Sequence, residues 1–352
     1  MPPSVDADNG FLSLDWRKKR NDVHTCTLVL DYNSPDVALL SDKDQIEVIR
    51  SDFDRGITEY TSFDGLYRDS IVTYDSSDKR MQFVAYAYSY EHMLTWRDIG
   101  YPSGKANYTK FTTAKAETIL KTLVDTNICG NALASNGRVE DAIYTGFSIE
   151  ADSARGNTLS IEISHQNLLD ALKKIVDAAG GDFKVTRTGL TTFRFDWVIP
   201  TDLSTGAAAV VFSLENANMG NPKLKQMRSQ ERTVAFVGGS GEDSTRIVRS
   251  VHGTNYNAST NRIEMFVDAR NSGTDTTILD GIGAVKLKET LYRNVIEYDV
   301  LQTQTCRVEK DYFLGNKTKA VFAGITATQY VDEIIFAYRD KKETVSVAMK
   351  DV

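Results

Sequence analysis

The chain has 352 residues, of which 41% are hydrophobic and 25% are charged. This composition is ordinary for a globular protein of two or three domains, and it excludes a chain that is disordered throughout. The net charge of −7 at pH 7 excludes a protein that grips nucleic-acid phosphates with a basic surface, but it is compatible with an acidic wall along which nucleic acid slides.

Cysteine usage and the N-terminal residues bear on the compartment. Three cysteines far apart, without a C-x-x-C pair, argue against both a disulfide framework and a zinc site: Cys26, Cys129 and Cys306. The first residues contain no basic segment followed by an apolar one, so no secretory signal is expected. No apolar run approaches about eighteen residues, so we also expect no membrane span. The protein is therefore expected to be made in a cytoplasm.

The first hundred residues have the pattern of short β-strands separated by polar turns. Strands are predicted over residues 25–30, 45–50, 68–74 and 81–88, and a short helix over residues 91–96. The polar segment Asp75–Asp78 joins the last two strands and predicts a hairpin. So many short strands favour a small barrel or sandwich, and we assign residues 1–105 to the first β-barrel domain.

The pattern changes near residue 110, where helical spacing of apolar residues begins. Residues 113–127 form the first predicted helix, with Thr113 as its cap, and residues 167–179 form the second, which Gly180 ends. A hairpin is predicted after them, with strands over residues 183–187 and 192–198. This region, residues 106–205, is expected to be an α+β insertion domain.

The last part of the chain is again mostly strand by pattern. Strands are predicted over residues 210–213, 232–237, 245–251, 303–308, 319–322 and 334–338, and a helix over residues 280–291. Residues 206–352 are therefore assigned to a second β-barrel domain that contains one helix. The fold class predicted for the whole chain is α+β and mainly β: two small, tube-like β-barrel domains with an α+β insertion between them.

Motifs that would indicate catalysis are not found. Gly238-Gly-Ser-Gly-Glu242 is not a nucleophile elbow, because a second glycine is required where Glu242 stands, and it lacks the Lys-Ser or Lys-Thr of a P-loop; a hairpin turn is expected. The histidines stand alone, without the spacing of a metal site: His24, His92, His165 and His252. We expect no catalytic residue, no cofactor and no metal.

A set of motifs in chain order resembles the siphovirus tail hub family of the actinophage ReqiPepy type, within the baseplate and tail-tip hub superfamily. The resemblance extends from about residue 11 to about residue 322. Its clearest part is the segment Arg262-Ile-Glu-Met-Phe-Val-Asp-Ala-Arg270, preceded by the glycine-rich turn. The residues that carry the resemblance form the candidate structural or interface motif: Trp16, Arg50, Gly238, Gly239, Gly241, Arg246, Arg262, Glu264, Asp268 and Arg270.

The resemblance implies a structural virion protein without chemistry of its own. It implies a homotrimeric ring at the phage tail tip, in which two barrels per subunit adapt a sixfold tail tube to a threefold tip. The tail tube or a distal tail protein would lie above, and tip, fibre or receptor-binding proteins below. Phage DNA would pass through the lumen without specific binding. Synthesis would take place in the host cytoplasm.

Two alternatives stay open at the level of sequence. One is a distal tail ring protein, which differs from a hub in having six copies instead of three. The other is a carbohydrate-processing or carbohydrate-binding β-protein, because 16 tyrosines and 3 tryptophans could line a groove. A ring former is expected to expose apolar patches on the single chain, whereas an enzyme is expected to have one pocket with perturbed carboxylates.

Overall fold

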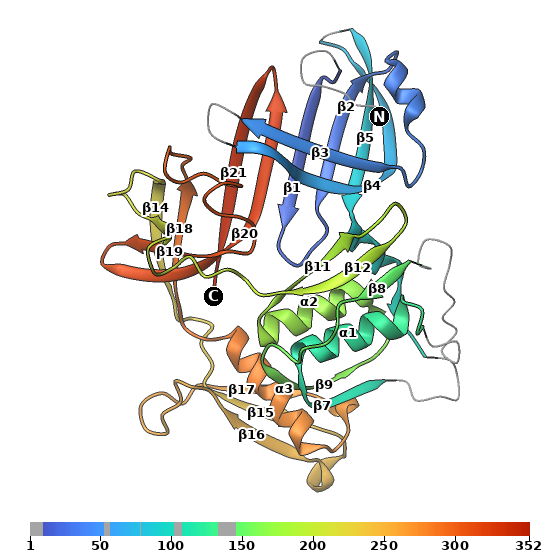
Figure 1. Ribbon diagram of the computed structural model, residues 1–352. Helices are drawn as coiled ribbons and strands as arrows, with labels where there is room; N and C mark the ends of the chain where they lie inside the picture. The colour runs from blue at the N-terminus through green and yellow to red at the C-terminus, as the bar shows by residue number, and fades with distance from the viewer. Residues whose placement is uncertain (1–9, 53–56, 78, 102–107, 133–145) are drawn as a thin grey trace. The chain divides into compact units, whose positions relative to one another are not determined.

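The structure is a computed structural model that describes residues 10–52, 57–77, 79–101, 108–132 and 146–352 (Figure 1). It is mainly β with few helices, which confirms the predicted α+β class. The chain divides into two compact units, and each is made of segments that are separated in the sequence. Unit 1 contains Met1–Met93, Pro200–Leu224 and Ile296–Val352, and unit 2 contains Leu94–Ile199 and Lys225–Val295.

Unit 1 is built around one nine-stranded sheet. Its strands are β1 (Ser13–Lys19), β2 (Thr25–Asp31), β3 (Gln45–Asp52), β4 (Ile57–Asp75), β5 (Arg80–Ser89), β13 (Val211–Phe212), β19 (Lys317–Phe322), β20 (Ile325–Arg339) and β21 (Lys342–Asp351). They pair in the order β13-β19-β20-β1-β2-β5-β4-β3, and β21 pairs with β20. Short 3-10 helices lie at Pro35–Leu39 (η1) and Tyr90–Trp96 (η2). In β14 (Met219–Met227) and β18 (Arg293–Val300), which pair with each other, the chain passes from one unit to the other.

The core of unit 1 lies on one side of this sheet. β3 and β4 pass in front of β1 and β2 in Figure 1, so the sheet folds over on itself. Trp16 on β1 stacks on Phe336 of β20 with ring centroids 4.7 Å apart, and both side chains are buried. Alternating residues of β5, such as Phe83, Ala85 and Ala87, are buried in the same way. This period-two alternation is why these segments form half-buried strands.

The two β-regions expected to form separate barrels contribute to the same sheet. β1 pairs with β20 along seven residues, Ser13↔Arg339 to Lys19↔Glu333, which joins the N-terminal and C-terminal strands. Among the described residues no strand pairing connects β3 with β13 or β21, so the sheet is open. The strand pairing therefore does not confirm two closed barrels.

Unit 2 contains the three α-helices and four small sheets of the described residues. The helices are α1 (Ala116–Asn127), α2 (Leu168–Ala179) and α3 (Thr276–Glu289). The sheets are β6 (Asp98–Ile99) with β10 (Gln166–Asn167); β7 (Thr109–Lys115) with β9 (Thr158–Ile163); β11 (Asp182–Arg187), β12 (Phe193–Val198) and β8 (Phe147–Ile149); and β16 (Val248–His252), β15 (Val234–Gly238) and β17 (Glu264–Asp268). Helices α1 and α2 bury their apolar faces completely, from Ile119 to Val124 and from Leu168 to Ile175.

Most predicted elements are confirmed. The last helix, α3, spans Thr276–Glu289 instead of residues 280–291, and two further details are wrong. Thr113 does not cap the first helix: it lies in β7, which pairs with β9, and α1 begins only at Ala116. Residues 303–308 form no strand, because the side chains of Gln302 and Arg307 bond to the backbone of their own loop. The division into domains 1–105, 106–205 and 206–352 stays a proposal. In the two-unit division, α3 and β15–β17 are grouped with the insertion.

Candidate assembly interface

The ten residues of the predicted motif lie in two places, and Trp16 and Arg50 form the smaller group, inside unit 1. The indole of Trp16 donates to Ser62 Oγ at 2.7 Å, and Ser62 in turn donates to the carboxylate of Glu309. Lys18 Nζ donates to Glu309 Oε1 at 2.7 Å. The Glu309 side chain is completely buried, so its charge is balanced by these contacts rather than by water. We call Lys18, Arg50, Ser62 and Glu309 the Glu309 cluster.

Arg50 connects this cluster to the last strand of the sheet. Its guanidinium donates to both oxygens of Glu343 on β21, at 2.6 and 2.7 Å, and lies 3.7 Å from Glu309. The same group lies over the ring of Phe336, 5.1 Å from its centroid. Such bidentate pairs have a defined geometry. Trp16 and Arg50 thus hold unit 1 together, and their proposed role in an interface is indirect.

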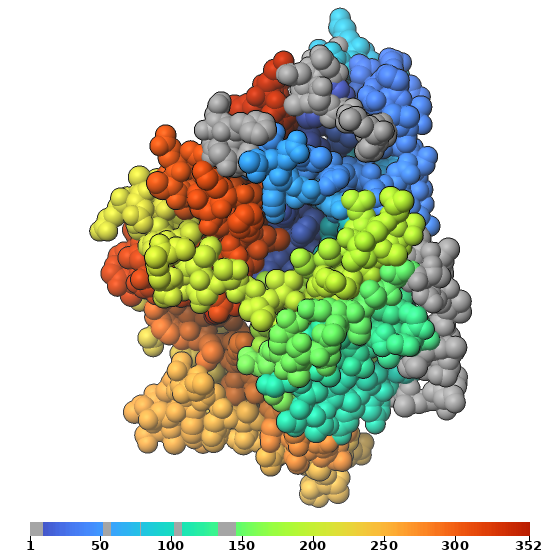
Figure 2. Space-filling model, viewed as in Figure 1, coloured from blue at the N-terminus to red at the C-terminus, as the bar shows by residue number. Residues whose placement is uncertain are grey.

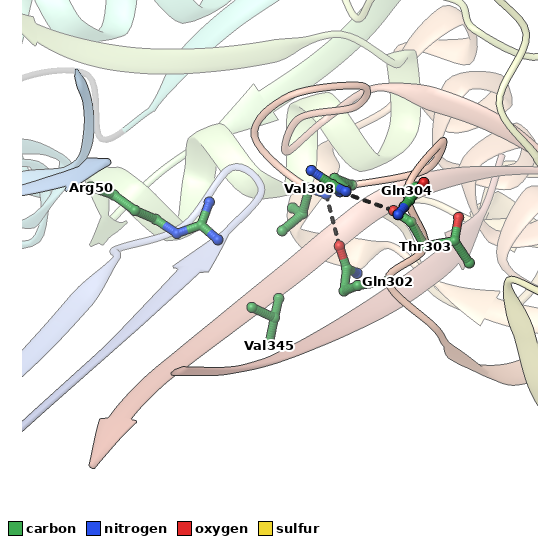
Figure 3. A pocket seen from close by; sticks show the side chains of 7 residues that line it. Arg50, Gln302, Thr303, Gln304, Val308 and Val345 are labelled. Atoms are coloured by element: carbon green, nitrogen blue, oxygen red, sulfur yellow. Dashed lines mark hydrogen bonds between the residues drawn. The ribbon is translucent and has the colours of Figure 1, made fainter. Parts of the chain in front are cut away.

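A pocket with a volume of about 270 Å³ opens beside Arg50 (Figure 3). Five of its seven lining residues are polar, and no aromatic ring lines it. Its residues are Arg50, Gln302, Thr303, Gln304, Arg307, Val308 and Val345. A carbohydrate groove would be expected to stack sugar rings on aromatic side chains, so this pocket does not support the carbohydrate alternative.

The other eight residues of the motif lie in unit 2. Six of them are in or beside the turn between β15 and β16, whereas Arg262 and Glu264 lie at the other end of β17, where Glu264 pairs with Val234 at the start of β15. The guanidinium of Arg246 donates to the carbonyl oxygens of Gly238 and Gly239, at 3.0 and 3.1 Å, and to Asp268 Oδ1 at 2.5 Å. A Cβ at Gly238 would lie 2.6 Å from this guanidinium. The glycine therefore leaves room for Arg246 to close the turn. Gly241 in the same turn has φ of 112°, in the left-handed region that glycine accepts.

Residues 262–270 present alternate side chains to the solvent. In β17 the side chains of Glu264, Phe266 and Asp268 lie on the exposed face, while Met265 and Val267 pack on the core that α3 covers. Phe266 is 58% exposed, and Arg246 lies over its ring, 5.3 Å from the centroid. An exposed aromatic ring beside arginines has the composition of an interaction hot spot. We call this surface the Phe266 face: Arg246, Arg262, Glu264, Phe266, Asp268 and Arg270.

Charges on the Phe266 face are arranged in pairs. Arg262 Nε donates to Glu264 Oε1 at 2.6 Å, and this bond raises the pKa of Arg262. Burial acts to raise the pKa of Asp268, but the backbone N–H of Arg270 and the guanidinium of Arg246 outweigh it, and the pKa is lowered. Asp268 is thus a carboxylate shared by two arginines. Sequence alternation in Glu264-x-Phe266-x-Asp268 could have indicated that Phe266 belongs with the motif.

The glycine turn gives a first testable prediction. A Cβ at Gly239 would lie 2.6 Å from the carbonyl oxygen of Gly273 and 2.8 Å from Leu279 of α3. Gly239→Ala is therefore expected to lower the free energy of unfolding by about 1–3 kcal/mol, as overpacking of a core does, measured by urea denaturation. Gly253→Ala is the control, because its Cβ would lie 3.6 Å or more from its neighbours. Equal stability of the two variants would contradict the packing described.

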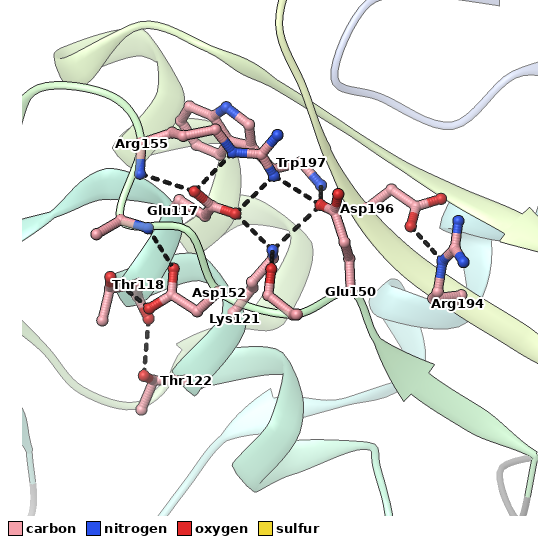
Figure 4. Close-up of polar contacts among 12 residues, drawn as sticks. Glu117, Thr118, Lys121, Thr122, Glu150, Asp152, Arg155, Arg194, Asp196 and Trp197 are labelled. Carbon is pink, nitrogen blue, oxygen red and sulfur yellow. Dashed lines mark hydrogen bonds and ion pairs between the residues drawn. The ribbon is translucent and has the colours of Figure 1, made fainter.

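A second buried ionic network, the Glu117 network, lies at the start of α1 (Figure 4). Glu117 accepts from Lys121 at 2.5 Å and from the backbone and guanidinium of Arg155 at 2.7–2.8 Å. Glu150 accepts from the same two cations. The bonds from Arg155, more than any other contact, hold the pKa of Glu117 far below its usual range. The charges of two carboxylates and two cations cancel in this network. Such a network is a structural arrangement and not a pair of carboxylic acids with pKa values suited to catalysis.

Two findings on the described part of the chain concern metal ligands and membrane-spanning helices. No three His, Cys, Asp or Glu side chains among the described residues are grouped so that they could hold a metal ion. The cysteines Cys26, Cys129 and Cys306 are free and buried. No described helix is long and apolar enough to cross a membrane.

Comparison with known proteins gives a consistent result. A family model described as "Siphovirus ReqiPepy6 Gp37-like protein" matches residues 6–349, whereas no curated protein matches. In fold, the chain is similar to the 43 kDa tail protein of prophage MuSo2 from Shewanella oneidensis, with TM-score 0.54 and 12% identity over 97% of this chain and 94% of that one. It is also similar to a tail protein from Neisseria meningitidis MC58, with TM-score 0.55 and 11% identity over 97% and 92%.

A third solved structure has the same fold. The prophage tail protein gp18 from Listeria monocytogenes EGD-e is similar with TM-score 0.52 and 10% identity, over 96% of this chain and 88% of that one. At such low identity the three structures show the fold alone. They share it along nearly the full length of the chain, including both units.

Proposed function

Because the chain belongs to the family of Siphovirus ReqiPepy6 Gp37-like proteins, which are structural phage tail proteins and not enzymes, we propose that it is the tail hub. In this proposal three copies form a ring at the tail tip of the virion and adapt a sixfold tail tube to a threefold tip. The observation that carries it is the match of fold with prophage tail proteins over 96–97% of the chain. The folded-over sheet of unit 1 supports a tube-like, barrel-forming domain.

Neighbours in the tail follow from this position. The tail tube or a distal tail protein would adjoin the ring above, and tip, fibre or receptor-binding proteins below. The Phe266 face is the surface that we assign to one of these neighbours, because it places an exposed aromatic ring among arginines. A net charge of −7 suits a lumen through which phage DNA passes without specific binding. Two barrel domains per subunit belong to the same proposal.

The mass of the purified chain in solution tests the hub directly. Light scattering over a concentration series is expected to give three times the chain mass of 39.2 kDa, because a closed ring of three copies is the assembly proposed. A mass of six chains would instead indicate the distal tail ring. A single chain at every concentration would contradict the trimer.

Phe266 provides a separate prediction for the neighbour-binding surface. Phe266→Ala is expected to leave folding and ring mass unchanged, because the ring is exposed, but to weaken binding in the tail by about 2 kcal/mol, roughly 30-fold. Introduced into the phage genome, the substitution would lower the number of infectious particles with a complete tail. Leu190→Ala is the control, because Leu190 is 83% exposed outside the face. Equal yields from the two variants would exclude Phe266 from the contact.

A further inference from the structure

The second half of β4 has a free edge. β3 pairs with the first part of β4 only, as far as Gln45↔Leu66, whereas β5 pairs with β4 as far as Asp75↔Arg80. On the side away from β5, no strand in the described part of unit 1 pairs with residues 69–75. The backbone N–H and C=O groups of such an edge can bond to a further strand.

The side chains of this edge do not protect it. Ile71, Val72 and Tyr74 are 51%, 47% and 63% exposed, and they are β-branched or aromatic, as in the interior strands of a sheet. The segment between Asp69 and Asp75 contains no proline and no lysine, the residues that usually blunt an edge strand. The tip of this β4–β5 hairpin, coloured light blue, projects from unit 1 in Figure 2. An unprotected edge of this kind indicates a partner strand.

β21 has another free edge in the same sheet. Within the residues that the structure describes, it pairs with β20 alone. Its side chains alternate: Val345, Val347 and Met349 join the core of unit 1, whereas Ser346 and Ala348 on the other face are exposed. β21 therefore has one face toward the core and one face toward the solvent. A strand that pairs with the free edge of β4 needs the same two faces.

We propose that residues 69–75 of one copy pair antiparallel with residues 344–350 of β21 in a second copy. This inference rests on the proposed ring and identifies the contact between neighbouring copies in it. In this register Val72 lies opposite Val347, and Tyr74 lies opposite Val345. Val72 is already the cross-strand partner of Phe83, a buried core residue. The core face of one copy therefore continues into the core face of the next, and the exposed Val72 and Tyr74 become covered.

Charge favours this pairing over the pairing of two β4 edges. The register places Asp69 of β4 opposite Lys350 of β21, which are both exposed, and opposite charges across strands are stabilising. Two β4 edges centred on Val72 would instead place Asp69 opposite Asp75 at both ends, where like charges repel. Contact between two different edges is head-to-tail, the kind of contact from which a ring of three copies is built, whereas contact between identical edges gives a twofold dimer.

Disulfide cross-linking of the full chain tests the register. Residues directly opposite in an antiparallel pair have Cα atoms about 4.5–5.5 Å apart, within reach of a disulfide. Thr73→Cys combined with Ser346→Cys is therefore expected to convert the one-chain band into a three-chain band after mild oxidation, on a gel run without reductant. The natural cysteines are buried and leave a low background.

Control variants separate the possible outcomes. Thr73→Cys with Thr344→Cys, two residues out of register, and each single cysteine variant are expected to stay uncross-linked. A trimer by light scattering without cross-linking of the Thr73/Ser346 pair would overturn this interface and leave the hub standing. A two-chain band from Val72→Cys alone, a residue that lies opposite its own copy when two β4 edges pair, would overturn it in favour of paired β4 edges. A six-chain mass with efficient cross-linking would support the interface and overturn the trimer, and a single chain at all concentrations would overturn both.

Discussion

Glu117→Gln is expected to lower the free energy of unfolding of unit 2 by about 3–5 kcal/mol, because it leaves the two cations Lys121 and Arg155 with one carboxylate, Glu150, in place of two. Glu117 is fully buried and accepts four hydrogen bonds, one from Lys121 and three from Arg155. Each carboxylate oxygen accepts two of these bonds, and an amide nitrogen in place of one oxygen cannot accept its two. Lys121, itself buried, would retain its bonds to Glu150 and to the carbonyl oxygen of Ala151.

Urea denaturation measures this loss. Trp197 reports on it by fluorescence, since its backbone N–H donates to Glu150 in the same network. Glu289→Gln in α3 is the matched control, because Glu289 forms an exposed ion pair with Lys286 and such pairs contribute about 0–1 kcal/mol. Equal stability of the two variants would show that the network contributes little.

The pH dependence of the Glu117→Gln effect has a defined sign. The pKa of Glu117 is lowered in the folded protein, first of all by the bonds from Arg155, while a glutamate in the unfolded chain has a pKa of about 4.3. Below about pH 4.3 the unfolded chain binds a proton that the folded protein does not, so wild-type stability falls as pH falls. The difference between wild type and Glu117→Gln is therefore expected to narrow from pH 7 to pH 3. A difference that is equal at both pH values would contradict an ionised Glu117.

Glu309→Gln is expected to have a comparable effect in unit 1, about 3–5 kcal/mol, for the same physical reason. The Glu309 side chain is completely buried between Lys18 and Arg50, and it accepts from Ser62 at 2.8–2.9 Å. Neutralising it would leave the positive charge of Lys18, whose side chain is 10% exposed, without its carboxylate partner. Trp16 shares Ser62 with this carboxylate, so its fluorescence reports on the change.

A matched variant distinguishes this effect from a general loss of charge. Glu215→Gln removes an exposed glutamate from the same unit, and its unfolding midpoint in urea is expected to equal that of the wild type. A small effect of Glu309→Gln would mean that water reaches the carboxylate. In that case the charge of Glu309 would not explain why Trp16 and Arg50 are held in the core of unit 1.

How much of the fold follows from the sequence depends on how local each signal is. The strand formers of β2 and the alternation of β3 and β12 predicted these elements, because burial of one face leaves a period of two. The helix α2 followed from apolar spacing, with Asn167 accepting from Leu169 N and Gly180 at its end. Residues 303–308 were wrongly predicted as a strand, because the side chains of Gln302 and Arg307 bond to the backbone of this loop.

The candidate site shows the same limit. The sequence order of Gly238, Arg246 and Asp268 indicated that they belong together, and Arg246 does bond to both of the others. Trp16 and Arg50 carried the same resemblance, yet they lie in a different unit, in a cluster centred on Glu309. No local sequence pattern indicates that Glu309 is the centre of this cluster, because its partners Lys18 and Ser62 lie 291 and 247 residues away in the chain.

By itself, the sequence determined what local pattern and family motifs encode: the α+β class, most strands and helices, and membership in a family of structural tail proteins. The tertiary structure alone decided which segments share a sheet, since β1 pairs with β20 more than 300 residues later. It also decided which charges are buried and which strand edges stay free. Those properties depend on contacts between distant segments. The periodicity of a segment predicts which of its faces is buried, but it does not predict which distant segment packs on that face or pairs with that edge.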